Sequence, residues 1–197
     1  MTTDSRTIGV YDARARDYAA RFASARPDRH LRTFIEALPK GARVLDLGCG
    51  PGHASAHMRA AGLIPDPVDA SAAMVRLAIE LHRLPARLAS FDDIDDVAAY
   101  DGVWANFSLL HAPRRDLPRH LAALHRALKP GGLLHLGMKT GGGEGRDGLG
   151  RFYSYYTVAE LGALLGAAGF AVVAQEEGRE RGLAGTEDPF VILHAHA

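Results

Sequence analysis

The fold of this chain is decided by one stretch of sequence, Val44-Leu45-Asp46-Leu47-Gly48-Cys49-Gly50-Pro51-Gly52. An apolar run ends there in an acidic residue, breaks into glycines at every second position and leads into a predicted helix over residues 53–61. A strand, a tight turn and a helix N-terminus in this order form the usual ligand-binding turn of an open α/β sheet. The dinucleotide fingerprint G-x-G-x-x-G needs a glycine where this chain has His53, so the pattern here is D-x-G-x-G-x-G.

Asp46 places a carboxylate two residues before the first glycine. A carboxylate at this point would repel a pyrophosphate and suits a ligand that ends in an ammonium group. The stretch resembles the first motif of class I S-adenosylmethionine (SAM) dependent methyltransferases of the small-molecule type. The resemblance covers nearly the whole chain. It implies a Rossmann-like α/β fold, with a doubly wound seven-stranded sheet, an antiparallel C-terminal strand and three αβα layers.

Periodic apolar positions predict alternating strands and helices, which is typical of a parallel sheet wound on both faces. Strands are predicted over 42–47, 63–68, 86–89, 101–106, 133–139, 170–177 and 189–196. Helices are predicted over 9–24, 28–38, 53–61 and 117–128, and two more begin at Ser71 and Thr157. We expect one domain over residues 1–197, with a helical lid over 1–38 and a mobile active-site loop over 140–156.

Two prolines fall in the second strand, which is an interior strand of the expected fold. Pro65 and Pro67 lie two residues apart, so both remove hydrogen-bond donors toward the same neighbouring strand. We therefore predict that one side of this strand is poorly paired.

Composition limits the possible partners and compartment. The formal net charge is +0, which gives no sign of the broad basic face that nucleic-acid binding needs. Cys49 is the single cysteine, so no disulfide forms within the chain, and no apolar run approaches the roughly 20 residues that span a bilayer. The N-terminal sequence is too polar for a signal peptide. We expect a cytoplasmic monomer or homodimer that binds neither membrane nor nucleic acid.

The resemblance assigns the donor site to the ends of the first two strands. Gly48, Cys49, Gly50 and Gly52 would let the backbone approach SAM, and Asp46 would lie near its ammonium group. A further set would hold the nucleoside: Asp69 the ribose hydroxyls, and Ala70 and Met74 one face of the adenine. The alternatives are an acidic cap on a glycine-rich turn, an Asp69 that caps the next helix, and a Met74 that belongs to the core.

The adenine contact departs from the family pattern. The loop after the third strand usually supplies an acidic residue followed by an apolar one, and here it has Ser90 and Phe91 with Asp92 displaced downstream. Phe91 would cover the ring, and Ser90 or Asp92 would accept from its amino group. The neighbouring aspartates also fit a solvated acidic loop or, less well, a cation site.

The fourth strand ends at Asn106, where the donor meets the acceptor. Enzymes that methylate base amines or glutamine amides resemble one another in carrying D/N-P-P-Y/F here, and this chain has Asn106-Phe107-Ser108-Leu109 instead, which argues against those substrates. His111 follows, and its intrinsic pKa suits an acid–base role, although a supporting role in the loop is an equal alternative.

An aromatic cluster follows the glycine-rich loop. We expect it to form the acceptor site together with the N-terminal helix, His111 and Tyr153 being the catalytic candidates and simple packing the alternative. The candidate acceptor-binding residues are Tyr11, Tyr18, His111, Arg151, Tyr153 and Tyr156.

The sequence therefore predicts methyl transfer from SAM to a small-molecule acceptor by in-line displacement, with S-adenosylhomocysteine as product. No metal is expected, because the HxxxH pair His53 and His57 lacks the adjacent glutamate of a zinc hydrolase. The acceptor atom stays open among O, N, S and oxyanions. The alternatives are a non-catalytic SAM-binding subunit and a nicotinamide-dependent oxidoreductase, against which His53 argues.

Overall fold

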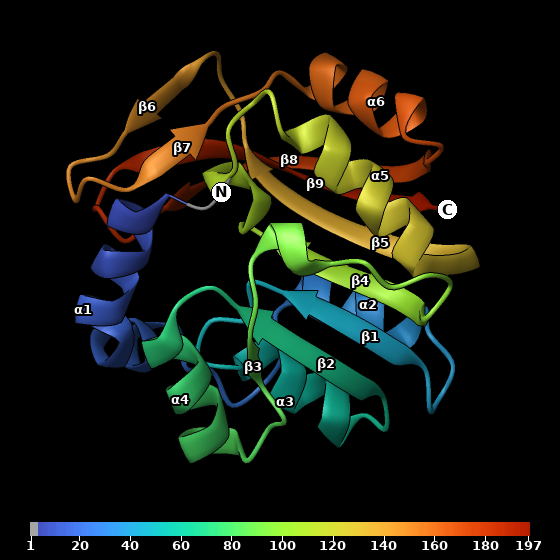
Figure 1. The fold of residues 1–197 in the computed structure, drawn as a ribbon, viewed down its shortest axis with the longest axis horizontal. Coiled ribbons are helices and arrows are strands. Elements are labelled where there is room, and N and C mark those ends of the chain that lie inside the picture. Colours follow the sequence, from blue (N-terminus) through green and yellow to red (C-terminus); the bar gives the residue numbers. More distant parts are fainter. Residues whose placement is uncertain (1–3) are drawn as a thin grey trace.

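The computed structural model describes residues 4–197, which form a seven-stranded sheet. Figure 1 shows the helices that cover this sheet. The strand order is β3-β2-β1-β4-β5-β9-β8, and within this sheet β9 runs antiparallel to both of its neighbours. The strands are β1 (Arg43–Leu47), β2 (Ile64–Asp69), β3 (Arg87–Leu88), β4 (Tyr100–Asn106), β5 (Leu128–Lys139), β8 (Ala171–Arg181) and β9 (Glu187–His196). The predicted α/β fold class is confirmed.

The helices pack on both faces of the sheet and form separate cores. They are α1 (Ser5–Phe22), α2 (Arg29–Glu36), α3 (His53–Ala60), α4 (Ala72–His82), α5 (Leu117–Ala127) and α6 (Val158–Ala167). Leu117, Leu121 and Leu124 lie on one face of α5 and are buried against the sheet, which stabilises the fold by about 1.5–3 kcal/mol for each side chain. Phe34 of α2 and Met58 of α3 bury themselves in a second core around Trp104.

Strand β2 is paired unequally on its two sides, as its prolines predict. All positions from Ile64 to Val68 pair with β1, and the Ile64 N–H donates to the carbonyl of Ala42 over 2.8 Å. Toward β3 only Val68 and Asp69 are paired. Because alternate residues of a strand point the same way, Pro65 and Pro67 face the β3 side, and the prediction of a poorly paired side is confirmed.

Residues 140–156, predicted as a loop, contain an antiparallel hairpin. Its strands are β6 (Glu144–Arg146) and β7 (Phe152–Ser154), and Gly145 pairs with Tyr153. The glycine-rich composition predicts a loop, so nothing in the sequence indicated this hairpin. Gly143 and Gly150, at φ of 76° and 88°, supply the turns at its ends. The closing strands are also longer than predicted, since β8 continues to Arg181.

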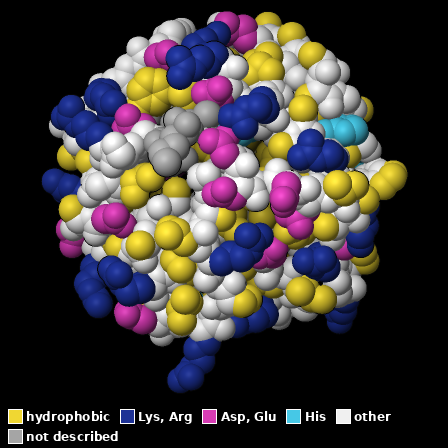
Figure 2. Space-filling model, in the orientation of Figure 1, with side chains coloured by type: hydrophobic (Ala, Val, Ile, Leu, Met, Phe, Trp, Pro, Cys, Tyr) yellow, Lys and Arg dark blue, Asp and Glu magenta, His cyan; other side chains and the backbone are white. Residues whose placement is uncertain are grey.

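Basic and acidic side chains are interspersed over the face that Figure 2 shows. The helices within residues 4–197 include none that is long and apolar enough to cross a membrane.

Helix α1 lies beside the carboxyl edge of the sheet, next to β7 and α4 (Figure 1). Asp4 caps its first turn by accepting from the Thr7 N–H over 2.8 Å. On one side, Asp12 accepts from the Ser71 hydroxyl (2.6 Å) and the Ala73 N–H (3.1 Å) at the start of α4. On the other side, the Thr7 hydroxyl accepts from the Phe152 N–H (2.8 Å) of β7. α1 therefore bridges the two sides of the edge at which β1, β2 and β4 end.

Candidate functional site

The glycine-rich turn between β1 and α3 is fixed by backbone geometry and crowding. Gly48 has φ of 77°, and a Cβ there would lie 2.4 Å from the Cβ of Ser108. Gly52 has φ of 85° and begins α3, packed against Ala78 and Leu84. The left-handed conformation and the close approach both require glycine at these positions. The turn thereby lies directly against the loop that follows β4.

Asp46 is a buried carboxylate beneath this turn. It is 2% exposed, and the Ser55 hydroxyl donates to its Oδ2 over 2.6 Å. Burial raises the pKa of Asp46 to about 7, against the opposing effect of the Ser55 hydrogen bond, and the charge of Asp69 raises it further. A cationic group of a ligand placed next to Asp46 would therefore face a carboxylate that has few other hydrogen-bond partners.

Asp69 connects the glycine turn to the next helix. Its Oδ2 accepts from the Gly50 N–H and its Oδ1 from the Ser71 N–H, each over 2.8 Å. Burial raises the pKa of Asp69 to about 6, although these two hydrogen bonds oppose the shift. A carboxylate has about four acceptor positions, so each oxygen can still accept from a ligand.

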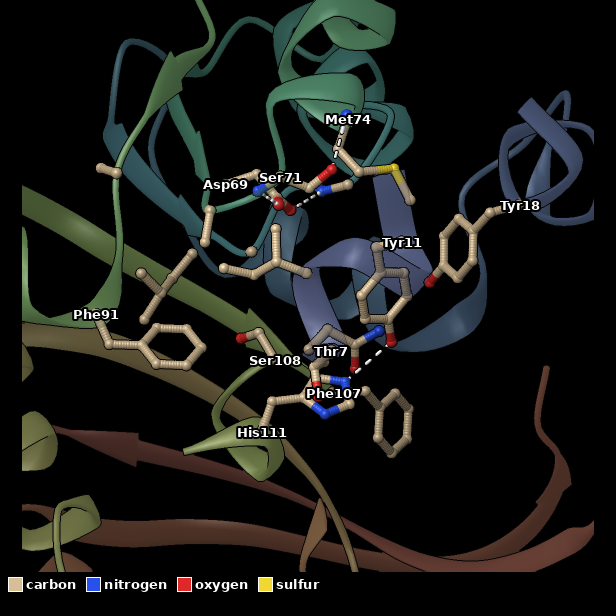
Figure 3. A pocket seen from close by; sticks show the side chains of 17 residues that line it. Thr7, Tyr11, Tyr18, Asp69, Ser71, Met74, Phe91, Phe107, Ser108 and His111 are labelled. Carbon is tan, nitrogen blue, oxygen red and sulfur yellow. Dashed lines mark hydrogen bonds between the residues drawn. The ribbon is translucent and has the colours of Figure 1, made fainter. Parts of the chain in front are cut away.

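Gly48, Gly50 and Asp69 line one side of a first pocket, which Figure 3 shows at close range. Asp69, Ser71 and Met74 lie on one wall, with Ser108 and His111 opposite, and Phe91 closes one end. Tyr11 and Tyr18 reach in from α1 at the other end. The predicted site residues in this pocket are Tyr11, Tyr18, Gly48, Gly50, Asp69, Ala70, Met74, Phe91, Asn106 and His111.

A second pocket shares Tyr11, Tyr18 and Phe107 with the first. Its walls are aromatic and come from distant parts of the chain: Tyr11, Tyr18, Phe22, Phe107, Tyr153 and Phe190. The two cations that line it are both paired, Lys139 with Asp188 (2.5 Å) and Arg151 with Asp147 (2.7 Å). Its lining therefore combines aromatic walls with cations that are already compensated, and it also includes the carboxylate of Glu180.

Phe107 stands where the pockets meet, and its backbone is strained. Its φ is 54°, in the left-handed region that bulky residues rarely occupy. The Phe107 N–H donates to the carbonyl of Gly137 (3.0 Å), and its ring packs edge-on against Phe190 (5.6 Å between centroids). Asn106 is held as well, since its Oδ1 lies 3.0 Å from Nε2 of His135. Such strain at a pocket wall is typical of a functional position.

His111 is held in one tautomer by its neighbours. Its Nδ1 lies 2.6 Å from the carbonyl of Phe152, which only accepts, so Nδ1 carries the proton. Burial lowers the pKa of His111 to about 4, although the hydrogen bond to Phe152 opposes the shift, so the ring is neutral at pH 7. Its Nε2 therefore accepts from the Tyr11 hydroxyl over 2.9 Å.

Arg151 completes this cluster. Its Nη1 donates to the Tyr11 oxygen over 2.9 Å, while Nε and Nη2 donate to Oδ2 of Asp147. The guanidinium also lies 5.2 Å from the centroid of the Tyr153 ring. Burial raises the pKa of Tyr11 and is the larger effect, whereas the charge of Arg151 lowers it. The pKa of Tyr11 therefore lies above its ordinary value.

Other predicted site residues lie away from these two pockets. Asp46 and Cys49 line a third, wider pocket beside them, and burial raises the pKa of the Cys49 thiol, which disfavours the thiolate form. Ser90 caps a short 3-10 helix, η1 (Phe91–Asp93), and Asp92 accepts from Arg119 over 2.6 Å.

Tyr156, a predicted acceptor-binding residue, and α2, part of the predicted lid, both lie outside the first two pockets. Tyr156 is buried beneath the guanidinium of Arg114, at 4.2 Å, and lines none of these three pockets. Of the predicted lid, α1 lines the first two pockets, whereas α2 is packed into the core through Phe34.

The HxxxH histidines bond to main-chain carbonyls, His53 to Ala19 (3.0 Å) and His57 to Ser24 (3.2 Å). Within residues 4–197 there is no group of three or more His, Cys, Asp or Glu placed to hold a metal.

Several residues of the site escaped sequence reasoning. Phe107, Asp147 and Lys139 are not part of a motif that indicates a function. Asp12 accepts a hydrogen bond from Ser71, the cap of α4, which lies 59 residues away in the sequence. One local signal was available, because Asp147 and Arg151 have the i, i+4 spacing of an ion pair.

Comparison with known proteins identifies the family. The family described as a methyltransferase domain matches residues 15–175. The malonyl-[acyl-carrier protein] O-methyltransferase of Erwinia billingiae is 37% identical over 97 residues, which cover 47% of this chain and 37% of that protein. The ubiquinone biosynthesis O-methyltransferase of Xanthomonas axonopodis pv. citri is 35% identical over 106 residues, covering 50% of this chain and 43% of that protein. The matches thus span less than half the length of these relatives.

Solved structures share the fold at lower identity. The 1,6-didemethyltoxoflavin-N1-methyltransferase of Burkholderia thailandensis, with bound S-adenosylhomocysteine, superposes with a TM-score of 0.74 at 23% identity, over 98% of this chain and 87% of that one. The [4+2]-cyclase SpnF superposes with a TM-score of 0.78 at 21% identity, over 100% of this chain and 97% of that one. Because a cyclase shares the fold, the fold by itself does not determine the reaction.

Proposed function

The chain belongs to the methyltransferase-domain family, and on that premise we propose that it transfers the methyl group of SAM to a small-molecule acceptor. One observation carries the proposal: a single pocket brings the glycine turn and Asp69 of one wall to face the neutral His111 of the other. A donor and a proton-accepting group would thus be held side by side. The related O-methyltransferases support the same reaction class.

The residues present fit SAM. Gly48 and Gly50 line the pocket, and at Gly50 an added Cβ would meet only the ring of Tyr18, at 3.8 Å, so the backbone there is open to a ligand. Asp69 would accept from the ribose hydroxyls with its remaining lone pairs, Met74 and Phe91 would cover the adenine, and Asp46 would face the ammonium group. When bound, SAM supplies an electrophilic methyl group on a sulfonium.

The chain's own residues would hold the acceptor and keep water away. The second pocket joins the first at Tyr11, Tyr18 and Phe107, so an acceptor there would approach the donor across this boundary. Alignment of two reactants in this way is worth several kcal/mol of barrier, of the order of 7–11 in ideal cases. The aromatic walls would exclude solvent from the reacting atoms.

The first experiment is calorimetric titration with SAM and with S-adenosylhomocysteine, using the wild-type chain and two variants. Asp69→Asn should weaken SAM binding about 10- to 100-fold, since charged hydrogen bonds contribute about 1.5–3 kcal/mol each. Asp66→Asn is the matched control, because Asp66 lies on the same strand but bonds to Arg87 and Tyr100. It should leave the affinity unchanged.

A panel of phenols, thiols, amines and carboxylates with labelled SAM then tests transfer. Absence of SAM binding would refute the proposal, and so would equal losses in the two variants. SAM binding without turnover on any acceptor would favour the alternative of a non-catalytic SAM-binding subunit.

A further inference from the structure

The hydroxyl of Tyr11 lies at the boundary of the two pockets and already has the hydrogen bonds of a proton relay. It accepts from Arg151 and donates to Nε2 of His111, each over 2.9 Å. Its ring lines both pockets, whereas His111 lines the first and Arg151 the second. The direction of each bond follows from chemistry, since guanidinium only donates and the His111 Nδ1–H is committed to the Phe152 carbonyl.

Resting on the proposed function, we propose that the acceptor is a neutral aromatic hydroxyl compound, a phenol, and that Tyr11 takes its proton and relays its own to His111. Tyr11 is then a catalytic residue that touches the acceptor. Arg151 is a positioning residue that also stabilises negative charge on the Tyr11 oxygen. His111 is the final proton acceptor.

The charges around the second pocket favour a neutral acceptor over an anion. Lys139 and Arg151 are paired with Asp188 and Asp147, and nearby Arg146 is paired with Asp4. The carboxylate of Glu180 also lines the pocket and would repel an anion. An anionic acceptor would have to compete with these carboxylates for its counter-charge. A planar ring, by contrast, fits walls formed by Phe107, Tyr153 and Phe190.

A neutral hydroxyl needs a base, and the cluster supplies one. The step balances as follows: a bond forms between the acceptor oxygen and the methyl carbon as the methyl carbon–sulfur bond breaks, leaving its electron pair on sulfur. The acceptor proton moves to the Tyr11 oxygen, and the Tyr11 proton moves to Nε2 of His111. The products are a methyl ether, a neutral thioether and an imidazolium that returns its proton to solvent.

The decisive measurement compares phenols of different acidity with wild type, Tyr11→Phe and Tyr155→Phe. With a phenol that is neutral at the assay pH, Tyr11→Phe should lower kcat about 100-fold with little change in KM, as expected for loss of general-base catalysis. With a nitro-substituted phenol that is ionised at the assay pH, the loss should shrink to a few-fold, because no proton must be removed. Tyr155→Phe is the matched control, since Tyr155 stacks on Tyr153 (6.0 Å between centroids) but lines neither pocket.

A loss that is equal for neutral and ionised phenols would overturn the relay and leave Tyr11 a structural role. Turnover confined to thiols, amines or carboxylates would overturn the phenol assignment while the proposed function stands. Absence of SAM binding would instead refute the proposed function.

A readout without turnover is ¹⁵N NMR of the His111 side chain. The relay requires the neutral Nδ1–H tautomer at pH 7, with an Nε2 resonance that shifts when Tyr11 is replaced by Phe. An Nε2–H tautomer or an imidazolium at pH 7 would overturn it.

Discussion

The two pockets that meet at Tyr11 are held together by different kinds of interaction. One wall of the first is formed by turns whose shape is set by backbone: glycines at positive φ, and main-chain N–H groups that donate to Asp69. The boundary with the second, and the second pocket itself, are formed by side chains from distant segments, fixed by ion pairs and by the hydrogen bonds of Tyr11 to His111 and Arg151. We infer that the glycine turn is rigid and sensitive to steric change, and that the side-chain cluster around Tyr11 is sensitive to charge.

The largest expected effect comes from adding one methyl group to the glycine turn. Gly48→Ala should abolish SAM binding and destabilise the fold, because its Cβ would meet the Cβ of Ser108 at 2.4 Å. Gly41→Ala is the matched control, with φ of 81° and no atom within 4 Å of the added Cβ. Both variants bear the left-handed backbone cost of about 1–2 kcal/mol.

Overpacking should cost Gly48→Ala a further 1–3 kcal/mol or so. Thermal unfolding measures the difference between the two variants, and calorimetry measures SAM affinity. Equal stability of the two would show that the turn yields to the added methyl group, which contradicts a rigid glycine turn.

The second prediction uses pH to compare two buried groups, Asp46 beneath the glycine turn and His111 in the side-chain cluster. The pKa of Asp46 is raised to about 7 from an unfolded value near 4, so the folded chain binds more protons between these pH values and its stability falls as pH rises from about 4 to 7. The pKa of His111 is lowered to about 4 from about 6.5, so its contribution has the opposite sign: stability rises as pH rises from about 4 to 6.5.

Denaturant unfolding from pH 4 to 8 measures both slopes. In the wild type, Asp46 should lower the free energy of unfolding by a few kcal/mol over its pH range, since one pKa unit corresponds to about 1.4 kcal/mol. Asp46→Asn should remove this decrease, so the stability of the variant should rise more steeply with pH. His111→Asn should do the reverse. If both variants change the slope in the same direction, burial does not shift the two pKa values in opposite directions as described.

Sequence reasoning could place residues that are close along the chain. Asp46, Gly48, Gly50 and Asp69 lie at the ends of two strands that parallel pairing places side by side, so spacing along the chain becomes proximity in the fold. The same alternation of strands and helices gave the sheet, and the prolines of β2 gave its unequal pairing. Each of these inferences depends on a repeating pattern or on backbone chemistry within a few residues.

The cluster of Tyr11, His111 and Arg151, where the two pockets meet, could not be assembled in this way. Tyr11, His111 and Arg151 were each named as candidates, but their contacts span 100 and 140 residues of sequence, and no periodicity reports such contacts. Tyr156 illustrates the opposite case: it lies in the same aromatic run as Tyr153, yet β7 ends at Ser154 and Tyr156 packs beneath Arg114. The hairpin β6–β7 decides which of these rings reaches the pocket, and its glycine-rich sequence reads as a loop.

The smallest expected effect concerns the attachment of α1 to β6, on which the second pocket depends. Asp4 both caps α1 and pairs with Arg146 over 2.7 Å, and this pairing with Arg146 holds the pKa of Asp4 well below its usual range. Asp4→Asn keeps a capping side chain and removes the charge, so it should cost less than about 1 kcal/mol, as exposed pairs do. Thr7→Ala removes the hydroxyl that accepts from the Phe152 N–H and should cost about 1–3 kcal/mol, because it leaves a donor of β7 unpaired.

Salt separates the two effects, since screening reaches the exposed ion pair but not the buried hydrogen bond. Raising ionic strength from about 0.05 M to 1 M should narrow the stability gap between wild type and Asp4→Asn and leave the Thr7→Ala gap unchanged. A Thr7→Ala variant as stable as wild type would show that α1 is held to β7 by packing alone. A gap for Asp4→Asn that does not narrow with salt would show that the ion pair with Arg146 contributes nothing to the attachment of α1.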